Sequence, residues 1–299
     1  MFEIFTNTNY LLGFFNNVAF LILLGLSLNI IMGYVGYLNL GHVGFWAIGS
    51  YTYTILLMQG HDFFVCLFAG AIAAAIAGLI LGLPTLKLRS HYIGIASLGF
   101  TYIVHSLSLN LTDITRGPLG IPGIPRPTIF GISFQSNHMY FLLSWAVTIV
   151  SGIIIYRLLH SPWGKILETI REDQVAAKTL GKNIFLYKIQ AFIISAFFAG
   201  IAAGIYSSFY QYIGGTNSFF IPQLLLLLTI VMLGGAGSFW GSVVGAVIVW
   251  IMYEGVRFLP IEAGLVGPVQ QATYAFVLVL IMIFRPRGIM GKNVKLLQK

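Results

Sequence analysis

The sequence predicts an all-α polytopic membrane protein, and two properties of the chain lead to this prediction. Hydrophobic residues make up 58% of the chain and charged residues only 8%, with a mean hydropathy of +0.90. A soluble domain has about 25% charged residues. Several uncharged apolar runs also reach the roughly 20 residues that a helix needs to cross a bilayer. We therefore expect one transmembrane domain over residues 1–299 with about 8–10 membrane-spanning helices.

Uncharged runs between turn signals give nine candidate spans. They cover residues 11–32, 40–58, 63–83, 91–110, 139–159, 189–212, 218–233, 239–258 and 266–284. The first run has no preceding basic residue or small-residue cleavage site, so we expect a span rather than a signal peptide. The segment 33–60 is the least regular, because six glycines interrupt it. It predicts either one broken helix or a re-entrant piece followed by a span.

The glycine-interrupted segment 33–49 is the best candidate for the lining of a translocation path. Irregular backbone at membrane depth is tolerated only where protein or a water-filled cavity surrounds it. Polar side chains lie in or beside this segment, and their exposure to lipid would cost free energy. These side chains are Asn29, Asn39 and His42. The alternative is that the glycines only allow helices to pack closely.

Basic residues predict the orientation in the membrane. Thirteen of the sixteen Lys and Arg lie around Lys87, within 157–188, and in the tail that begins at Arg285. Because basic residues accumulate in cytoplasmic loops, we expect a cytoplasmic loop at 160–188 and a cytoplasmic C-terminus. The loop 111–138 is then extracytoplasmic, and its Pro and Gly residues predict an ordered cap of turns rather than a helix.

The segment 162–180 predicts a short amphipathic helix within the large cytoplasmic loop. Pro162 suits a first helical turn, and Gly181 suits the position just after the last one. Apolar residues form one stripe at helical spacing, namely Ile166, Ile170, Ala177 and Leu180. Such a helix lies on the bilayer surface or docks in a groove on a partner. Three nearby acids favour docking, because an anionic lipid surface would repel them.

The sequence also argues against several chemistries. No Gly-Lys pair is followed by Ser or Thr, as a P-loop requires, so we expect a non-enzyme that does not itself hydrolyse ATP. Cys66 is the only cysteine, which predicts neither a disulfide nor a thiolate metal site. Glu254 and Arg257 share one helix face and predict a snorkelling or capping ion pair before a proton relay. The net charge of +8 reflects topology and does not predict nucleic-acid binding.

Several motifs resemble those of one transporter family. The segment IREDQVAAKTLGKNIFLYKIQAFIISAFFAGIAAGIY is similar to the coupling loop and following span of permease subunits of ATP-driven (ABC) branched-chain amino acid importers, above all the LivM type. The paired alanines Ala176 and Ala177, with Gly181 four residues later, match the family's coupling-loop pattern. Other matching pieces follow in the family's order over residues 25–291: GLSLNIIMGYVGYLNLGHVGFWAIGSYTY, LKLRSHYIGIASLGF, TRGPLGIPGIP and FRPRGIMG.

The resemblance implies a type II importer permease in the bacterial cytoplasmic (inner) membrane. It implies cytoplasmic ATP-binding subunits, a second related permease subunit and an extracytoplasmic solute-binding protein, so that ATP is used by partners and this chain binds no cofactor and no metal. The residues expected to couple to the ATPase are Arg171, Glu172, Asp173, Ala176, Ala177 and Gly181.

The substrate class is less specific than the family. An uncharged path suits a zwitterion with an apolar side chain, because a fixed binding charge would trap it. Related permeases import urea or short amides, so these substrates stay open beside branched-chain amino acids. An ion-coupled secondary carrier is disfavoured, since ionisable groups are scarce where ion coupling needs them. A membrane subunit that transports nothing is the remaining alternative.

Overall fold

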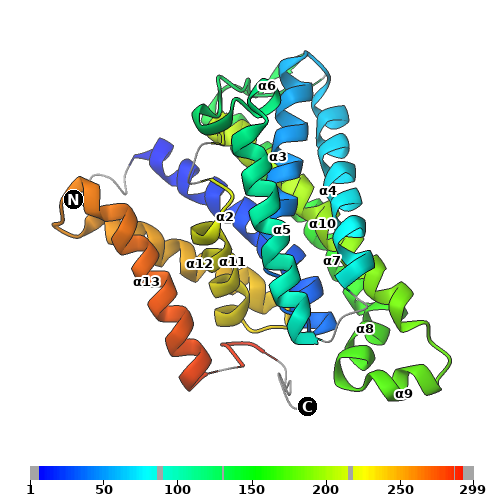
Figure 1. The fold of residues 1–299 in the computed structure, drawn as a ribbon. Coiled ribbons are helices and arrows are strands. Elements are labelled where there is room, and N and C mark those ends of the chain that lie inside the picture. The colour runs from blue at the N-terminus through cyan, green and yellow to red at the C-terminus, as the bar shows by residue number, and fades with distance from the viewer. Residues whose placement is uncertain (1–6, 86–89, 130, 215–217, 286, 292–299) are drawn as a thin grey trace.

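The computed structural model describes residues 7–291 except 86–89, 130, 215–217 and 286, and this part of the chain forms a bundle of helices (Figure 1). Each of the nine expected apolar runs is a helix within these described residues. Seven helical segments are long and apolar enough to cross a membrane, and one further apolar helix is shorter. The all-α polytopic fold predicted from the sequence is therefore confirmed.

The first helix among the described residues is α2 (Thr8–Asn29), which continues without a gap into the π-helical segment η1 (Ile30–Val35). The other main helices are α3 (His42–Met58), α4 (Phe63–Thr85), α5 (Ser90–Asn110), α7 (Asn137–His160), α8 (Pro162–Glu172), α9 (Gln174–Thr179), α10 (Ile184–Tyr210), α11 (Ile221–Gly234), α12 (Phe239–Gly255) and α13 (Ala263–Phe284). The irregular segment 33–60 is thus a π-helical end, a short linker and one helix.

The core of the bundle surrounds α2, whose residues 16–29 are all buried. Helices α7, α10, α11 and α12 pack around it, and α10 also packs along α3 and α4. Close approach depends on small residues: a Cβ at Gly200 of α10 would lie 2.6 Å from the Ala71 Cα of α4. The outer helices α5 and α13 expose large apolar side chains such as Ile95 and Ile283, as a lipid-facing surface requires.

The loop 111–138 forms a cap of short elements at one end of the bundle (Figure 1). It contains one helical turn, α6 (Thr112–Thr115), then η2 (Gly117–Leu119), β1 (Ile121–Pro122), β2 (Thr128–Ile129) and β3 (Ile132–Ser133). Strand β1 pairs antiparallel with β4 (Tyr212–Ile213), which ties the loop to the end of α10. The expected turn-rich cap is correct, with α6 as its one four-residue α-helix among the described residues.

Helices α8 and α9 lie at the other end, together with the last turn of α13 (Figure 1). The segment after α13 is held there, because the Ile289 N–H donates to the Leu233 carbonyl at 2.8 Å. The basic loop and the start of the basic tail therefore share one end of the molecule, in agreement with the expected common side. Lys87, Arg89 and residues 292–299 lie outside the described residues.

Candidate functional site

The expected single helix over 162–180 is two helices, α8 and α9, which meet at Asp173. The Asp173 backbone is extended (φ −150°, ψ 105°). Its carboxylate accepts hydrogen bonds from the N–H groups of Val175 at 2.8 Å and Ala176 at 3.0 Å. A side-chain acceptor that satisfies free N–H groups starts a new helix. The single-helix prediction is wrong, because Asp173 caps the second helix instead of continuing the first.

Helix α9 presents an apolar tip, defined here as Val175, Ala176 and Leu180. Val175 is 73% exposed and Leu180 70% exposed. Of the expected apolar stripe, Ile170 and Ala177 are buried in the bundle and Leu180 is exposed, while Leu167, which was not in the stripe, is buried as well. Gly181 follows α9 with a left-handed backbone (φ +72°), and the Lys182 N–H donates to the Ala177 carbonyl at 3.3 Å. This Schellman ending agrees with the predicted role of Gly181 after the helix.

Arg171 fastens α8 to the end of the central helix. Its guanidinium donates a hydrogen bond to the Gly33 carbonyl in η1. Gly36 and Gly237 both have φ of +83°, and a Cβ at either would lie within 2.6 Å of Arg171 side-chain atoms. Glycine is therefore needed twice, for the backbone conformation and for space. Burial lowers the pKa of the Arg171 guanidinium from its ordinary value, because the charged form loses water.

A second polar contact joins the same elements. The Lys188 ammonium, near the start of α10, donates to the Tyr37 hydroxyl and to the Gln174 side-chain oxygen at 3.0 Å. The ammonium also lies 4.6 Å from the centroid of the Tyr37 ring, within cation–π distance. Gln174 belongs to α9 and Tyr37 follows η1, so these residues connect α9, α10 and the linker 36–41. Sequence reasoning noted Lys188 only as part of a family pattern and missed this connection.

The six residues expected to couple to an ATPase separate into two groups. Ala177 is 1% exposed and Arg171 is half-buried against η1, so both face the bundle. The other four lie exposed on α8, α9 or their junctions: Glu172, Asp173, Ala176 and Gly181. Contact between these exposed residues and an ATPase stays a prediction. The geometry gives Arg171 and Ala177 partners within this chain.

Asn29 is buried and hydrogen-bonded at both ends of its side chain. Its amide donates to the Ser238 carbonyl at 2.9 Å, and its oxygen accepts from the Gly237 N–H at 2.9 Å. Asn29 therefore ties the last residue of α2 to the turn between α11 and α12. A Cβ at Gly33 would lie 1.9 Å from the same Asn29 oxygen. This contact explains why the glycine-rich segment needs a glycine at that position.

Asn39 and His42 are also fully buried, in the linker and at the start of α3. The Asn39 oxygen accepts from the Gly41 N–H at 3.0 Å, and His42 Nε2 lies 2.8 Å from the Ser27 hydroxyl. The amide nitrogen of Asn39 and Nδ1 of His42 have no hydrogen-bond partner among the described residues. The linker is also held by α5, since the Thr101 hydroxyl donates to the Leu40 carbonyl at 2.7 Å. Whether these residues line the path stays a prediction.

Sequence reasoning missed a cavity at the end opposite α8 and α9. It has a volume of about 280 Å³, near the lower end of the roughly 300–1,000 Å³ typical of ligand pockets. Its walls are mainly aromatic and come from six helices, with Trp46, Tyr206, Trp250, Tyr253 and Tyr274 among them. We call it the aromatic cavity. Aromatic residues occur throughout this chain, so no local pattern marks these five.

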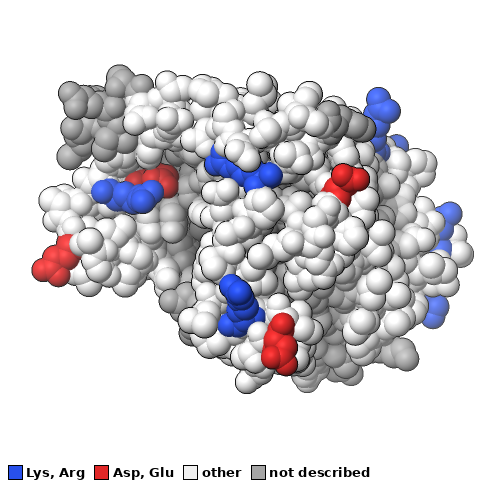
Figure 2. All heavy atoms as spheres, turned by 90° about the horizontal axis from the view of Figure 1, so that it is seen from above, with Lys and Arg blue, Asp and Glu red and all other residues white. Residues whose placement is uncertain are grey.

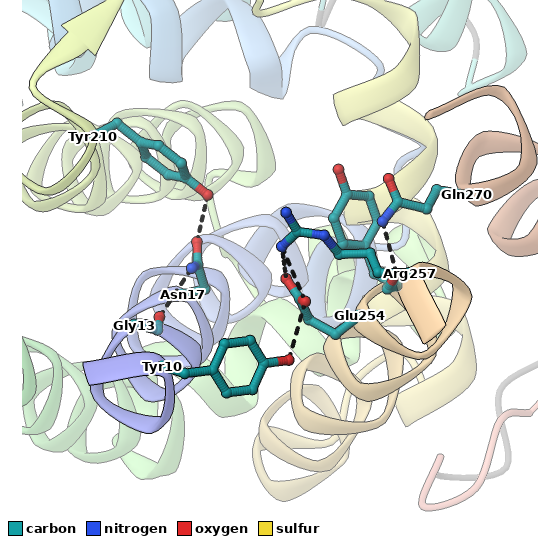
Figure 3. A network of polar contacts seen from close by, with 8 residues as sticks. Tyr10, Gly13, Asn17, Tyr210, Glu254, Arg257 and Gln270 are labelled. Atoms are coloured by element: carbon teal, nitrogen blue, oxygen red, sulfur yellow. Dashed lines mark hydrogen bonds and ion pairs between the residues drawn. The ribbon is translucent and has the colours of Figure 1, made fainter. Parts of the chain in front are cut away.

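Figure 3 shows a network of polar contacts that includes the cavity residue Tyr210. Arg257 donates to both Glu254 oxygens at 3.2 Å, which confirms the expected ion pair. The Tyr10 hydroxyl donates to Glu254 at 3.3 Å, and the Tyr210 hydroxyl, at the cavity, donates to Asn17 at 2.6 Å. These contacts join the beginning of α2 to the ends of α10 and α12.

Comparison with known proteins gives consistent results. Residues 10–285 match the model of the family described as branched-chain amino acid transport system / permease component. The chain is 37% identical over 294 residues to the high-affinity branched-chain amino acid transport system permease protein LivM of Escherichia coli K12, covering 90% of this chain and 67% of that protein. It is 24% identical to the probable LivM of Methanocaldococcus jannaschii, covering 91% and 90%.

The comparisons also bear on the fold and the breadth of the family. The guanosine permease NupQ of Bacillus subtilis is 25% identical over 191 residues, covering 58% of this chain and 59% of that protein. A solved inward-facing structure of a metal-chelate type ABC transporter superposes with a TM-score of 0.51 at 17% identity, covering 93% of this chain and 87% of that one. This likeness agrees with the type II importer fold that was expected. The chain belongs to the branched-chain amino acid permease family and is a multi-pass membrane transport protein.

Proposed function

We propose that this chain is the membrane-spanning permease subunit of an ABC importer for branched-chain amino acids in the bacterial inner membrane. Separate ATP-binding subunits dock on the apolar tip of α9. These subunits, and not this chain, bind and hydrolyse ATP. A second, related permease subunit and an extracytoplasmic solute-binding protein complete the transporter. The observation that carries the proposal is the pairing of an exposed apolar tip with a base fastened to the bundle through Arg171 and Lys188.

The arrangement suits transmission of motion. A displacement of α9 would pull on the linker 36–41 through Lys188 and Tyr37, and a displacement of α8 would pull on η1 through Arg171. The same segment holds Asn39 and His42, so movement of the ATPase subunits would change the surroundings of the expected path. In this proposal α8, α9 and the C-terminus lie in the cytoplasm, because the basic residues gather there.

The neighbouring alanines of α9 provide a matched test of docking. We expect Ala176→Asp to abolish co-purification of the ATPase subunits without changing the unfolding temperature, because Ala176 is exposed. Ala177→Asp should both abolish co-purification and lower the unfolding temperature, since it buries an unpaired charge. Co-purification and thermal unfolding of the detergent-solubilised transporter measure the two effects. ATPase subunits that stay bound to the Ala176→Asp variant would contradict docking on this tip.

State-dependent labelling tests the path. Cysteines replace Asn39 or His42 in a Cys66→Ser background, and a small water-soluble thiol reagent is applied to the complete transporter. We expect no labelling in the resting state, because both positions are buried, and labelling during ATP turnover as the path opens. A cysteine at Asn29 is the comparison, since its neighbours are the backbone atoms of the turn 237–238. Positions 39 and 42 that stay inert in every transport state would show that the segment is only packing.

A further inference from the structure

The aromatic cavity lies at the far end of the bundle from the coupling helices. Helix α10 begins directly after α9 and is 27 residues long, about 40 Å at 1.5 Å per residue. The cavity residues Tyr206 and Tyr210 are in its last turns. Trp250 and Tyr253 likewise lie near the end of α12. Seen from above in Figure 2, this end of the molecule carries only scattered charged side chains.

Polar groups of the cavity are available to a ligand. The hydroxyls of Tyr206, Tyr253 and Tyr274 have no hydrogen-bond partner in the part of the chain that the structure describes. Tyr274 is 4% exposed as a whole residue, so the cavity reaches only a small part of its side chain. Phe20, Leu21, Leu226 and the two tryptophans supply apolar wall. A molecule with both a polar and an apolar end fits this combination.

The ion pair supplies charges of both signs beside the cavity. Glu254 directly follows the cavity residue Tyr253, and Arg257 lies about one helical turn beyond it; neither is part of the cavity wall, and the Arg257 side chain is 58% exposed. Its Nη1 bonds Glu254, and no bond to its Nη2 is seen among the described residues. A guanidinium recognises a carboxylate through paired N–H groups. An ammonium group is attracted by tyrosine ring faces and by the Glu254 carboxylate.

We propose that the aromatic cavity is a binding site for the amino-acid substrate on the side opposite the coupling helices. The substrate carboxylate lies at Arg257, its ammonium lies against the tyrosines, and its apolar side chain lies against Leu21, Leu226 and Trp250. This inference rests on the proposed function and adds to it a place where the permease itself contacts the substrate.

Protection of a cysteine in the cavity wall tests the site. Gln271 lines the cavity and is exposed, so Gln271→Cys in a Cys66→Ser background gives one accessible thiol. The complete transporter in lipid vesicles is labelled with a charged methanethiosulfonate reagent, with and without L-leucine, glycine or guanosine. We expect leucine at saturating concentration to slow labelling about tenfold, as occupancy of roughly nine sites in ten requires. Glycine should protect less, because it has no side chain for the apolar wall.

A cysteine outside the cavity provides the control. Leu119 is exposed in η2 and does not line the aromatic cavity, so labelling of Leu119→Cys should not respond to leucine. Equal labelling of Gln271→Cys with and without leucine, or protection by guanosine alone, would overturn the proposal. Uptake of leucine by the same vesicles is measured in parallel. Absent uptake would refute the proposed function, whereas uptake without protection would refute only this site.

Arg257 variants test its part in binding. Arg257→Gln should abolish protection by leucine while labelling without leucine stays unchanged, and Arg257→Lys should keep part of it. Because Arg257→Gln leaves Glu254 unpaired, the double variant Glu254→Gln/Arg257→Gln removes that cost. Full protection in the double variant would overturn the assignment of Arg257 to the substrate carboxylate.

Discussion

The two ends of the bundle differ in how many of their polar side chains are hydrogen-bonded within the chain. At the coupling end, Arg171 and Lys188 donate to groups on other elements and join α8, α9 and α10 to η1 and the linker. At the far end, the hydroxyls of Tyr206, Tyr253 and Tyr274 surround a cavity without partners among the described residues. Groups tied to each other transmit displacement, whereas free groups can exchange water for a ligand. On the two proposals above, one end couples to the ATPase subunits and the other binds the substrate.

The largest effect is expected where the coupling end is most crowded. A Cβ at Gly33 would lie 1.9 Å from the Asn29 oxygen and 2.2 Å from the Gly237 nitrogen, which is backbone. We expect Gly33→Ala to lower the free energy of unfolding by about 3 kcal/mol, as overpacking does. Gly99→Ala, with open space around it, should be neutral or stabilising. Equal stability of the two variants in a denaturant titration in detergent would show that the crowding is relieved at no cost.

Substitution of Arg171 should impair the coupling of ATP hydrolysis to uptake more than the assembly of the transporter. We expect Arg171→Leu to reduce ATP-dependent uptake about tenfold or more, because a charge-assisted hydrogen bond is worth about 1.5–3 kcal/mol. ATP hydrolysis and co-purification of ATPase subunits should persist, since Arg171 faces η1. The control is Lys165→Gln, at an exposed position of the same helix that is not among the expected coupling residues, and it should keep uptake. Normal uptake by Arg171→Leu would show that the contact between Arg171 and η1 does not transmit motion from the ATPase subunits.

Much of the fold could be predicted from the sequence, because each helix is indicated by the composition of its own residues. Each of the nine apolar runs is long enough to be recognised by composition, and each forms a helix among the described residues. The Glu254–Arg257 pair was expected for the same reason, since three residues on a helix bring two side chains together. The break at Asp173 was missed, because an acidic residue fits both the middle of an amphipathic helix and a capping position.

The site depends on contacts between distant parts of the chain, and these leave no local signal. Asn29 was recognised as a polar residue near the path, but its partner Gly237 lies 208 residues later. The aromatic cavity draws its walls from α2, α3, α10, α11, α12 and α13, so it exists only after these helices pack. Arg171 was assigned to the ATPase because it lies in the charged loop that resembles the family's coupling loop, whereas two distant glycines make room for it against η1.

The smallest effect is expected at the cap between the coupling helices. Asp173→Ala removes the acceptor for the Val175 and Ala176 N–H groups, and loss of such a cap costs about 1 kcal/mol. Helix α9 has only six residues, so it has little other local stability. Hydrogen exchange of the α9 amides should rise about fivefold in this variant, and ATPase docking should weaken by a similar factor. Asp173→Asn should behave like the unchanged chain, because asparagine caps equally well without the charge. If Asp173→Asn weakens docking as much as Asp173→Ala while the exchange of α9 stays normal, the carboxylate acts by its charge on the ATPase and not by shaping the apolar tip.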